Sequence, residues 1–331
     1  MKALSILLLA FPWPAYCGQT YYVSTSGDDS HPGTFSQPFR TVQRAADLVA
    51  PGDSVLIRSG VYREYLTVER SGAPGAPISF AAFAGETAIL DGTGLDWRYG
   101  INVEGSDYLR FEGIAVRNYS RGGAPGFGFV SWSHSSGIEL RRMEFSGVGT
   151  AVKLHAGGDG IFLEDIGARD YAWSGFDCGP AGPGRQITLR RFAAWGPGTG
   201  NDTAADGFAV ETGADIRVED CLSSGHAGDG FDFKSDRTEL VRVVSLRNAR
   251  NNLKLWGKDS TVVNSLSVDS GLTNLVLSEW GTYTVANCLF AGSLSYGYLA
   301  EFGYGGGATG AAVYNSIFYS DRPEMGGTLV Y

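Results

Sequence analysis

The sequence predicts an all-β solenoid in which short strands wind into successive coils. Nine segments share the pattern (apolar)-x-(small or polar)-(apolar or small)-x-x, and their starts are offset by 21 to 29 residues. A fixed repeat of this length is typical of solenoids. Glycine is frequent (48 of 331 residues) and helical periodicity is almost absent, as expected for coils with a tight turn at each corner. The segments begin at Phe111, Leu140, Leu163, Leu189, Val218, Val241, Val262, Val285 and Val313.

Residues 1–19 have the features of a secretory signal peptide. Lys2 precedes an apolar run from Ala3 to Phe11, and small residues follow near Gly18. This run is too short to span a membrane, and no later run is long enough. We therefore expect a protein secreted to the extracellular space or the periplasm. A lipid anchor on Cys17 is the alternative, although Tyr16 is bulky where a small residue is expected.

Residues 20–331 are expected to form one β-helix domain, in which residues 20–90 supply the N-terminal cap and the first coils. Each end of a solenoid exposes an apolar coil and needs a cap. A short helix capped by Thr41 and ended by Pro51-Gly52 would provide one, with the apolar face Val42, Ala45, Ala46 and Val49. Regular coils follow over residues 91–331. At the other end, either the sequence is truncated or residues 325–331 fold across the open coil.

Each regular coil carries a second strand with the pattern (small)-(apolar)-x-(apolar). Its copies begin at Ser174, Asp206, Asp229, Asn251, Thr273 and Tyr296. Alternate residues of a strand point to opposite faces, so the apolar residues fill the interior and the others form outward columns on an exposed ridge. The first outward column is predicted to contain Asp177, Ala209, Asp232, Lys254, Val276 and Leu299. The second is predicted to contain Glu211, Lys234, Trp256, Ser278 and Glu301.

This arrangement predicts a cluster of carboxylates. Asp206 and Asp229 begin equivalent strands of adjacent coils, Asp232 projects outward in mid-strand, and Asp202 lies just upstream. A cation would remove the repulsion between such groups, and Ca²⁺ accepts roughly six to eight oxygen ligands in loose geometry. The alternative is that the two Asp-Gly pairs are ordinary turns. That explanation does not apply to Asp232, because aspartate is disfavoured inside strands.

Lys254 is the candidate general base, one coil beyond Asp232 in the same column. A lysine beside a bound divalent cation or an arginine is pushed towards its neutral form. A neutral amine can take a proton from a carbon next to a carboxylate, and a cation would stabilise the developing enolate. This is the chemistry of β-elimination in a polyuronate chain. The alternative is an ordinary surface lysine paired with Asp232.

Several neighbouring residues are candidates for substrate binding. Arg250 or Arg247 could assist Lys254 by pairing with a second sugar carboxylate. Lys234 is a further substrate-binding candidate, and Trp256 could stack on a sugar ring. His226 is interpreted as an ordinary loop histidine. The net charge of −9 and a pI near 5.0 argue against nucleic acid as a partner. We expect a monomer. Its three mature cysteines, Cys178, Cys221 and Cys288, exclude a full disulfide framework.

Two stretches resemble known families. YYVSTSGDD and the residues that follow it up to Glu64 resemble the start of many secreted right-handed parallel β-helix proteins. The DGF, DGFDFK and NNLKLWG segments are similar to polysaccharide lyase family 9, the pectate lyase group. The resemblance implies a single-stranded right-handed parallel β-helix, Ca²⁺ ligands at Asp206, Asp229 and Asp232, and Lys254 as the Brønsted base. That family has a further Asp where this chain has Gly228, so one ligand is missing.

The predicted function is therefore Ca²⁺-assisted β-elimination of an acidic polysaccharide, with pectate or polygalacturonate as the substrate. Alginate is the second substrate, because Lys234-Ser235 faintly resembles a motif of β-helix alginate lyases. Hydrolysis by paired carboxylates in the same fold is one rival function. A non-catalytic carbohydrate-binding or surface protein is the other, since a fold does not prove an activity.

Overall fold

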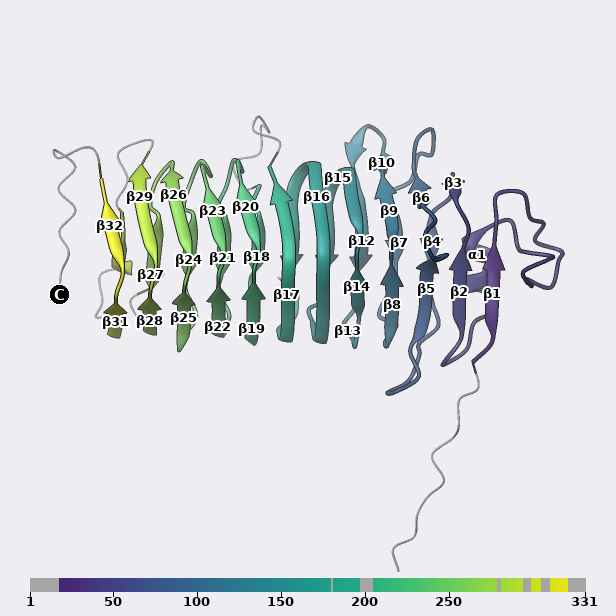
Figure 1. Cartoon of the computed structure of the whole chain (residues 1–331), viewed down its shortest axis with the longest axis horizontal. Helices are drawn as coiled ribbons and strands as arrows, with labels where there is room; N and C mark the ends of the chain where they lie inside the picture. The colour runs from purple at the N-terminus through teal and green to yellow at the C-terminus, as the bar shows by residue number, and fades with distance from the viewer. Residues whose placement is uncertain are drawn as a thin grey trace, which may run out of the picture.

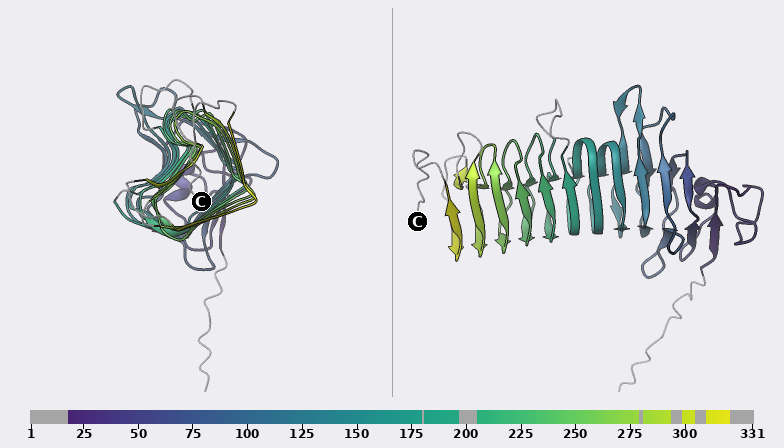
Figure 2. Two further views of the ribbon diagram at one scale, coloured as in Figure 1. Left: turned by 90° about the vertical axis from the view of Figure 1, so that its left-hand side faces the viewer. Right: turned by 45° about the horizontal axis from the view of Figure 1, so that its top comes forward.

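The computed structural model describes residues 18–179, 181–196, 205–278, 281–293, 299–304 and 310–320. Nearly all of the predicted signal segment lies outside these residues, as do Asp202, Tyr296 and residues 325–331. The described residues form an elongated stack of parallel strands with a short helix at the N-terminal end (Figure 1). Viewed along the long axis, the coils superpose (Figure 2). The predicted parallel β-helix is confirmed.

The strands form three faces along the solenoid. The first face contains β1 (Thr20–Val23), β2 (Ser54–Ile57), β5 (Ile78–Ala82), β8 (Leu109–Glu112), β14 (Glu139–Arg141), β19 (Gly213–Glu219), β22 (Asp236–Val241), β25 (Ser260–Val263), β28 (Thr282–Ala286) and β31 (Gly310–Tyr314). The second contains β3 (Gly60–Tyr62), β6 (Ala88–Asp91), β9 (Ile114–Arg117), β20 (Leu222–Ser224), β23 (Val244–Leu246), β26 (Leu266–Ser270), β29 (Leu289–Ser293) and β32 (Ile317–Tyr319).

The third face, called the site face below, carries the second strand of each coil. It contains β4 (Leu66–Thr67), β7 (Tyr99–Asn102), β12 (Phe127–Ser131), β18 (Phe208–Val210), β21 (Phe231–Phe233), β24 (Leu253–Leu255), β27 (Leu275–Ser278) and β30 (Glu301–Tyr304). Three long strands bend around corners and join faces: β15 (Glu144–Leu154), β16 (Gly158–Cys178) and β17 (Gly184–Trp195). The short β13 (Ser135–Ser136) pairs with β16, and β10 (Ser120–Arg121) forms an antiparallel pair with β11 (Ala124–Pro125).

The repeat pattern arises from the corner between the first and second faces. One residue per coil turns this corner in the left-handed conformation, with φ between 46° and 56°. Asparagine and aspartate, which tolerate this conformation better than most residues, occupy five of these eight corners, and arginine occupies the other three. These corner residues are Arg142, Asp165, Arg191, Asp220, Arg242, Asn264, Asn287 and Asn315.

The predicted interior columns are confirmed. Phe176, Phe208, Phe231, Leu253 and Leu275 follow one another in register and are fully buried. The rings of Phe208 and Phe231 stack with centroids 4.7 Å apart. The site face is therefore held in register by an apolar column behind it.

Two predicted registers are wrong. Leu240, rather than Val241, pairs with Val218, because the buried side chain must occupy the interior position. In the last described coil, Glu301 pairs with Val276, so Glu301 belongs to the first outward column and replaces Leu299. The predicted repeat that starts at Tyr296 is thus displaced by two residues. The strand pair β27–β30 also contains an irregularity, which a regular offset could not predict.

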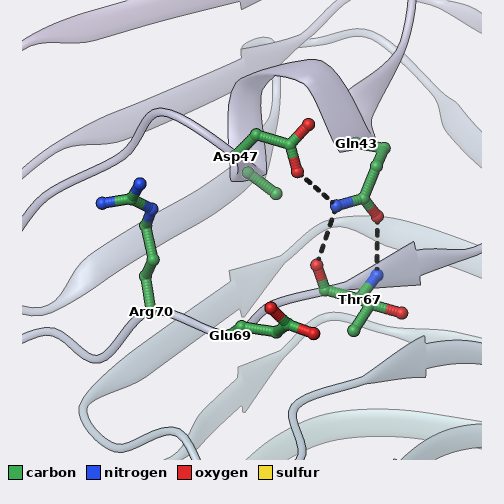
Figure 3. Close-up of a pocket in the computed structure, with 6 residues that line it drawn as sticks. Gln43, Asp47, Thr67, Glu69 and Arg70 are labelled. Atoms are coloured by element: carbon green, nitrogen blue, oxygen red, sulfur yellow. Dashed lines mark hydrogen bonds between the residues drawn. The ribbon is translucent and has the colours of Figure 1, made fainter.

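The N-terminal helix is confirmed but is shorter than expected. Helix α1 covers Val42–Ala46, and the Thr41 hydroxyl accepts the Arg44 N–H. Gln43 ties α1 to β4, because its side chain bonds both backbone polar groups of Thr67 (Figure 3). None of the helices in the described part of the chain is long and apolar enough to cross a membrane. The three cysteines there are buried and unpaired.

Candidate active site

The site face brings the predicted base beside two of the predicted acids. Lys254 on β24 lies directly opposite Asp232 on β21. The Lys254 Nζ atom is 3.0 Å from Asp232 Oδ2 and 3.2 Å from Asp229 Oδ2. We call Asp206, Asp229, Asp232 and Lys254 the acid–lysine cluster. Its carboxylates and its amine come from three successive coils.

The expected exposed ridge is wrong, because most of this cluster is buried. Asp229 and Asp232 are only 2% and 4% exposed, and the Lys254 side chain is 14% exposed. The neighbouring outward residues Ala209 and Val276 are also buried. Charges held away from water interact more strongly than charges on an open surface. The cluster is therefore a site where small changes of charge have large effects.

Backbone and amide groups hold the carboxylates in place. Asp229 Oδ1 accepts hydrogen bonds from the backbone N–H and the side-chain amide of Asn251, at 2.8 and 2.9 Å. Asp206 Oδ1 accepts the backbone N–H of Asp229 at 2.6 Å. Asp206 and Asp229 are thus each oriented by the coil that follows, at the corner where each site-face strand begins.

Gly228 has a specific steric role. A Cβ atom at this position would lie 2.3 Å from Asp206 Oδ1. The Asp206 carboxylate therefore occupies space that any side chain at position 228 would need. The Asp206 carboxylate thus excludes a side chain at position 228, where the family resemblance would lead one to expect a further Asp.

Burial sets the protonation of the acids. It raises the pKa of Asp206 to about 7, and the nearby charges of Asp229 and Asp232 add to this effect, although the hydrogen bond from the Asp229 N–H opposes it. Burial also raises the pKa of Asp232, against the opposing influence of Lys254 and Lys234. Burial would lower the pKa of Lys254, but Asp232 and Asp229 outweigh it and raise that pKa. Without another cation, Lys254 holds its proton.

Lys234 and Trp256 border the cluster. Lys234 Nζ is 2.5 Å from Glu211 Oε2 and 3.4 Å from Asp232 Oδ2, so it links the two outward columns. The Trp256 ring is 39% exposed, and its centroid is 4.7 Å from Lys254 Nζ. Both predicted binding residues therefore lie beside the candidate base. The sequence places Glu211 in the second outward column but does not indicate its contact with Lys234.

Of the two predicted arginines, Arg250 lies next to the acid–lysine cluster and Arg247 lies further away along the coil. Arg250 is exposed in the turn next to the cluster, where its backbone N–H bonds the Gly228 carbonyl at 3.1 Å. Arg247 follows β23 on the second face and is exposed. The hydrogen bonds and ion pairs among the described residues do not join its side chain to the cluster. Asp202 lies outside the described residues.

The acids suit a hard cation by their chemistry. Asp232 Oδ1 is buried and has no hydrogen-bond partner among the described residues, so one acceptor in the cluster is unused. Carboxylate oxygens are preferred ligands of Ca²⁺. The part of the chain that the structure describes nevertheless contains no group of three acidic, His or Cys side chains already arranged around one metal position. In this arrangement the Lys254 ammonium neutralises Asp229 and Asp232.

A second charged group lies further along the site face. Lys153 Nζ is 2.5 Å from Asp177 Oδ2, and both side chains are largely buried. Burial raises the pKa of Asp177, Lys153 lowers it, and Glu211 and His155 also act on it through their charges. The sequence contained this signal, because Lys153 stands one coil before Asp177 in the first outward column.

Two other features do not belong to the site. His226 is buried, hydrogen-bonded to Tyr171 and Asn248, and burial lowers its pKa to about 4. It therefore supports the interior rather than the reaction. A polar pocket of ≈ 250 Å³ between α1 and β4 (Figure 3) is lined by Gln43, Ala46, Asp47, Thr67, Glu69 and Arg70. It lies seven coils from Lys254, or about 34 Å at the spacing of parallel strands.

Three proteins illustrate what this chain is similar to. Pectate lyase PEL9 of Emericella nidulans is 25% identical, and the alignment covers 83% of each protein. Pectate lyase L of Dickeya dadantii is 24% identical over 92% of this chain and 66% of its own length. A local match to the uncharacterized protein YwoF of Bacillus subtilis is 41% identical, but covers only 23% of this chain and 16% of that protein.

Solved structures share the fold. The crystal structure of pectate lyase Pel9A aligns with a TM-score of 0.64 and 19% identity, over 94% of this chain and 81% of its own. A GH136 lacto-N-biosidase from Eubacterium ramulus aligns with a TM-score of 0.60 and 13% identity, over 91% of this chain and 68% of its own. At these identities the structures establish the architecture alone.

The family follows from a match over most of the chain. The model of one protein family, described as "Pel9A-like, right handed beta helix region", matches residues 21–300. This range includes the N-terminal cap, all coils up to β29 and the whole acid–lysine cluster. The chain belongs to the family of Pel9A-like right-handed β-helix proteins.

Proposed function

We propose that this protein is a polysaccharide lyase that cleaves a pectate-like polyuronate by β-elimination, with Lys254 as the general base. The observation that carries this proposal is the position of the Lys254 amine. It lies on the site face, 3.0 and 3.2 Å from two buried carboxylates, and beside an exposed tryptophan. Similarity to two pectate lyases supports the choice of substrate.

The reaction needs Lys254 to accept a proton. In its neutral form, Nζ takes the proton from the sugar carbon next to the carboxylate. The electron pair left behind forms a C=C bond to the adjacent carbon, the bond from that carbon to the glycosidic oxygen breaks, and this oxygen takes a proton from solvent. In this proposal Arg250 pairs with one substrate carboxylate and Lys234 with another. Trp256 provides a face for a sugar ring.

The acids explain why a cation is part of the proposal. Asp229 and Asp232 raise the pKa of Lys254 and keep it protonated. Calcium, if held by Asp206, Asp229 and Asp232, would offset part of the negative charge of these carboxylates and of the substrate carboxylate, which would favour both a neutral lysine and a developing enolate. Asp202 is a further candidate ligand. The predicted signal segment at residues 1–19 supports the proposal that the enzyme acts outside the cell.

The test compares three lysine variants on polygalacturonate and alginate, each with added calcium or with a chelator. The readout is the ultraviolet absorbance of the unsaturated product. Lys254→Arg keeps the positive charge between Asp229 and Asp232 but cannot lose its proton at neutral pH. We expect it to lower the rate by about 10²-fold or more, a typical contribution of a positioned base. Lys254→Met should be equally inactive.

Lys258→Met is the matched control, because Lys258 is an exposed lysine in the turn after β24. It should retain the rate of the wild type. The lyase proposal fails if no polyuronide yields unsaturated product, or if Lys254→Arg keeps the full rate. If the chelator leaves the wild-type rate unchanged, calcium is not required for the reaction and its proposed role is wrong.

Hydrolysis is the second candidate function, and one observation favours it. Burial and neighbouring charges raise the pKa of Asp206 to about 7, so this carboxyl holds a proton near neutral pH as a general acid would. Asp229 or Asp232 would then act as the base that activates water. In that case the products are saturated, reducing ends accumulate without ultraviolet absorbance, and the chelator has no effect.

A further inference from the structure

A row of aromatic side chains runs along the N-terminal half of the solenoid. Tyr65 stacks on Trp97 with ring centroids 4.1 Å apart, and Trp97 meets Tyr99 edge-on at 5.9 Å. Tyr99 and Phe127 both lie against Trp132, at 6.5 and 5.3 Å. Tyr65 is exposed, and Trp97, Tyr99 and Trp132 are partly exposed. We call these residues, without the buried Phe127, the aromatic strip.

The register brings rings of neighbouring coils together. Tyr99 on β7 pairs with Phe127 on β12, and Trp132 directly follows β12. Added Cβ atoms at Gly100 and Gly128 would meet the side chains of Val116 and Phe145, so both glycines face the core. Of the rings that precede them, Phe127 is buried and Tyr99 is partly exposed. Trp132 therefore lies over Phe127 and next to the exposed part of Tyr99.

The aromatic strip is continuous with the acid–lysine cluster. Trp132 contacts the His155 ring at 5.2 Å. Trp132 follows Val130 by two residues and His155 follows Lys153 by two, and Val130 and Lys153 are paired in register. The register then continues through Asp177, Ala209 and Asp232 to Lys254. The aromatic strip and the acid–lysine cluster therefore lie on one row of coils, parallel to the solenoid axis.

Arg98 adds one positive charge to the strip. Its guanidinium lies 5.6 Å from the Phe127 ring centroid and 6.0 Å from that of Trp132. Arg98 is exposed, and the ion pairs formed among the described residues do not include it. A planar guanidinium is well suited to bind a carboxylate in two hydrogen bonds. Flat rings next to one free guanidinium suit an extended chain of pyranose sugars that carries carboxylates.

We propose that the aromatic strip and Arg98 form distal subsites for the same polysaccharide, where the sugars remote from the cleavage point stack on the rings and one carboxylate pairs with Arg98. This inference rests on the proposed function, since it takes Lys254 as the cleavage point. Binding energy from remote parts of a substrate serves to hold the reacting part in position. The strip should therefore favour long chains over short ones.

The strand register gives the length of polysaccharide that can reach the aromatic strip from Lys254. Val130 on β12 is followed in register by Lys153, Asp177, Ala209, Asp232 and Lys254, which is five steps. At about 4.8 Å for each step, Trp132 lies about 24 Å from Lys254, and Tyr65 lies two coils further on. A uronide trimer bound at Lys254 cannot reach Trp132, whereas an octamer can.

The experiment uses galacturonate trimer and octamer with the full-length wild type, Trp132→Ala, Arg98→Ala and the control Tyr319→Ala. Tyr319 is an exposed aromatic residue on β32 of the second face. Equilibrium binding is measured with a chelator present, and kcat/KM with calcium. We expect Trp132→Ala and Arg98→Ala each to weaken octamer binding and lower octamer kcat/KM about 10-fold, as loss of one stacked ring or one charged pair does. Trimer values and the control should not change.

The outcomes separate the two proposals. If Trp132→Ala changes binding and kcat/KM equally for trimer and octamer, or changes neither, the strip does not form distal subsites. This conclusion holds even if Lys254-dependent elimination is intact. If octamer binding depends on Trp132 but no unsaturated product forms, the proposal of distal subsites is supported and the proposal of lyase activity is overturned. Absence of both binding and product overturns both.

Discussion

Replacing Asp206 by asparagine should stabilise the protein at alkaline pH. The pKa of Asp206 is raised from its ordinary value of 3.8 to about 7, mainly because the carboxyl is buried. In the unfolded chain the same group ionises near pH 4. Between these two values the folded state binds more protons than the unfolded state, so stability is lost as pH rises from about 4 to about 7. Asparagine carries no charge and removes this loss.

The magnitude follows from the two pKa values. A difference of this size corresponds to about 4 kcal/mol when Asp206 is fully ionised. Asp206 is only partly buried from solvent, and screening by water reduces the effect, so we expect a gain of about 2 to 4 kcal/mol at pH 8. The gain should be close to zero at pH 4. The amide oxygen of Asn can still accept the Asp229 N–H, so the structural hydrogen bond is kept.

Urea unfolding followed by tryptophan fluorescence, at pH 4 and pH 8 with a chelator, measures this gain. Asp215→Asn is the matched control from the same coil. Its pKa is lowered by the Arg237 pair, so its replacement should not stabilise the protein at pH 8. A variant Asp206→Asn that is no more stable than the wild type at pH 8, or that is equally stabilised at pH 4, would show that this carboxylate is not desolvated. If calcium binds at the cluster, adding it should stabilise the wild type more than the variant.

Two further changes test the packing behind the site. Gly228→Ala places a Cβ 2.3 Å from Asp206 Oδ1, so it should cost about 1 to 3 kcal/mol in urea unfolding and reduce elimination, whereas Gly310→Ala, which meets only ordinary contacts, should be tolerated. Unchanged stability and activity of Gly228→Ala would mean that Asp206 is free to move. Burial lowers the pKa of His226 from 6.5 to about 4, so the unfolded state binds the extra proton in this range and stability falls on acidification. The advantage of the wild type over His226→Gln in free energy of unfolding should therefore shrink by about 2 kcal/mol between pH 7 and pH 5. If the difference in free energy of unfolding between the wild type and His226→Gln is the same at both pH values, His226 is not a buried, neutral histidine.

The repeat predicted the architecture because each coil obeys the same local rules. A buried apolar position must alternate with an outward one, and one residue must turn the corner in a left-handed conformation. These rules place Asp232 and Lys254 side by side without any tertiary information. They fail where the chain departs from strict repetition. Val241 and Leu240 are both apolar, and an irregular strand pair shifts the register near Glu301.

The sequence alone thus determined the parallel β-helix, the capping helix and the adjacency of acids and lysine, since all three depend on short-range periodicity. Only the tertiary structure decided that the cluster is mostly buried and that Asp206 fills the space at Gly228. It also decided that aromatic residues from separate coils line one side of the solenoid. Burial and side-chain direction depend on every neighbouring coil at once, and a repeat pattern records only the position within one coil.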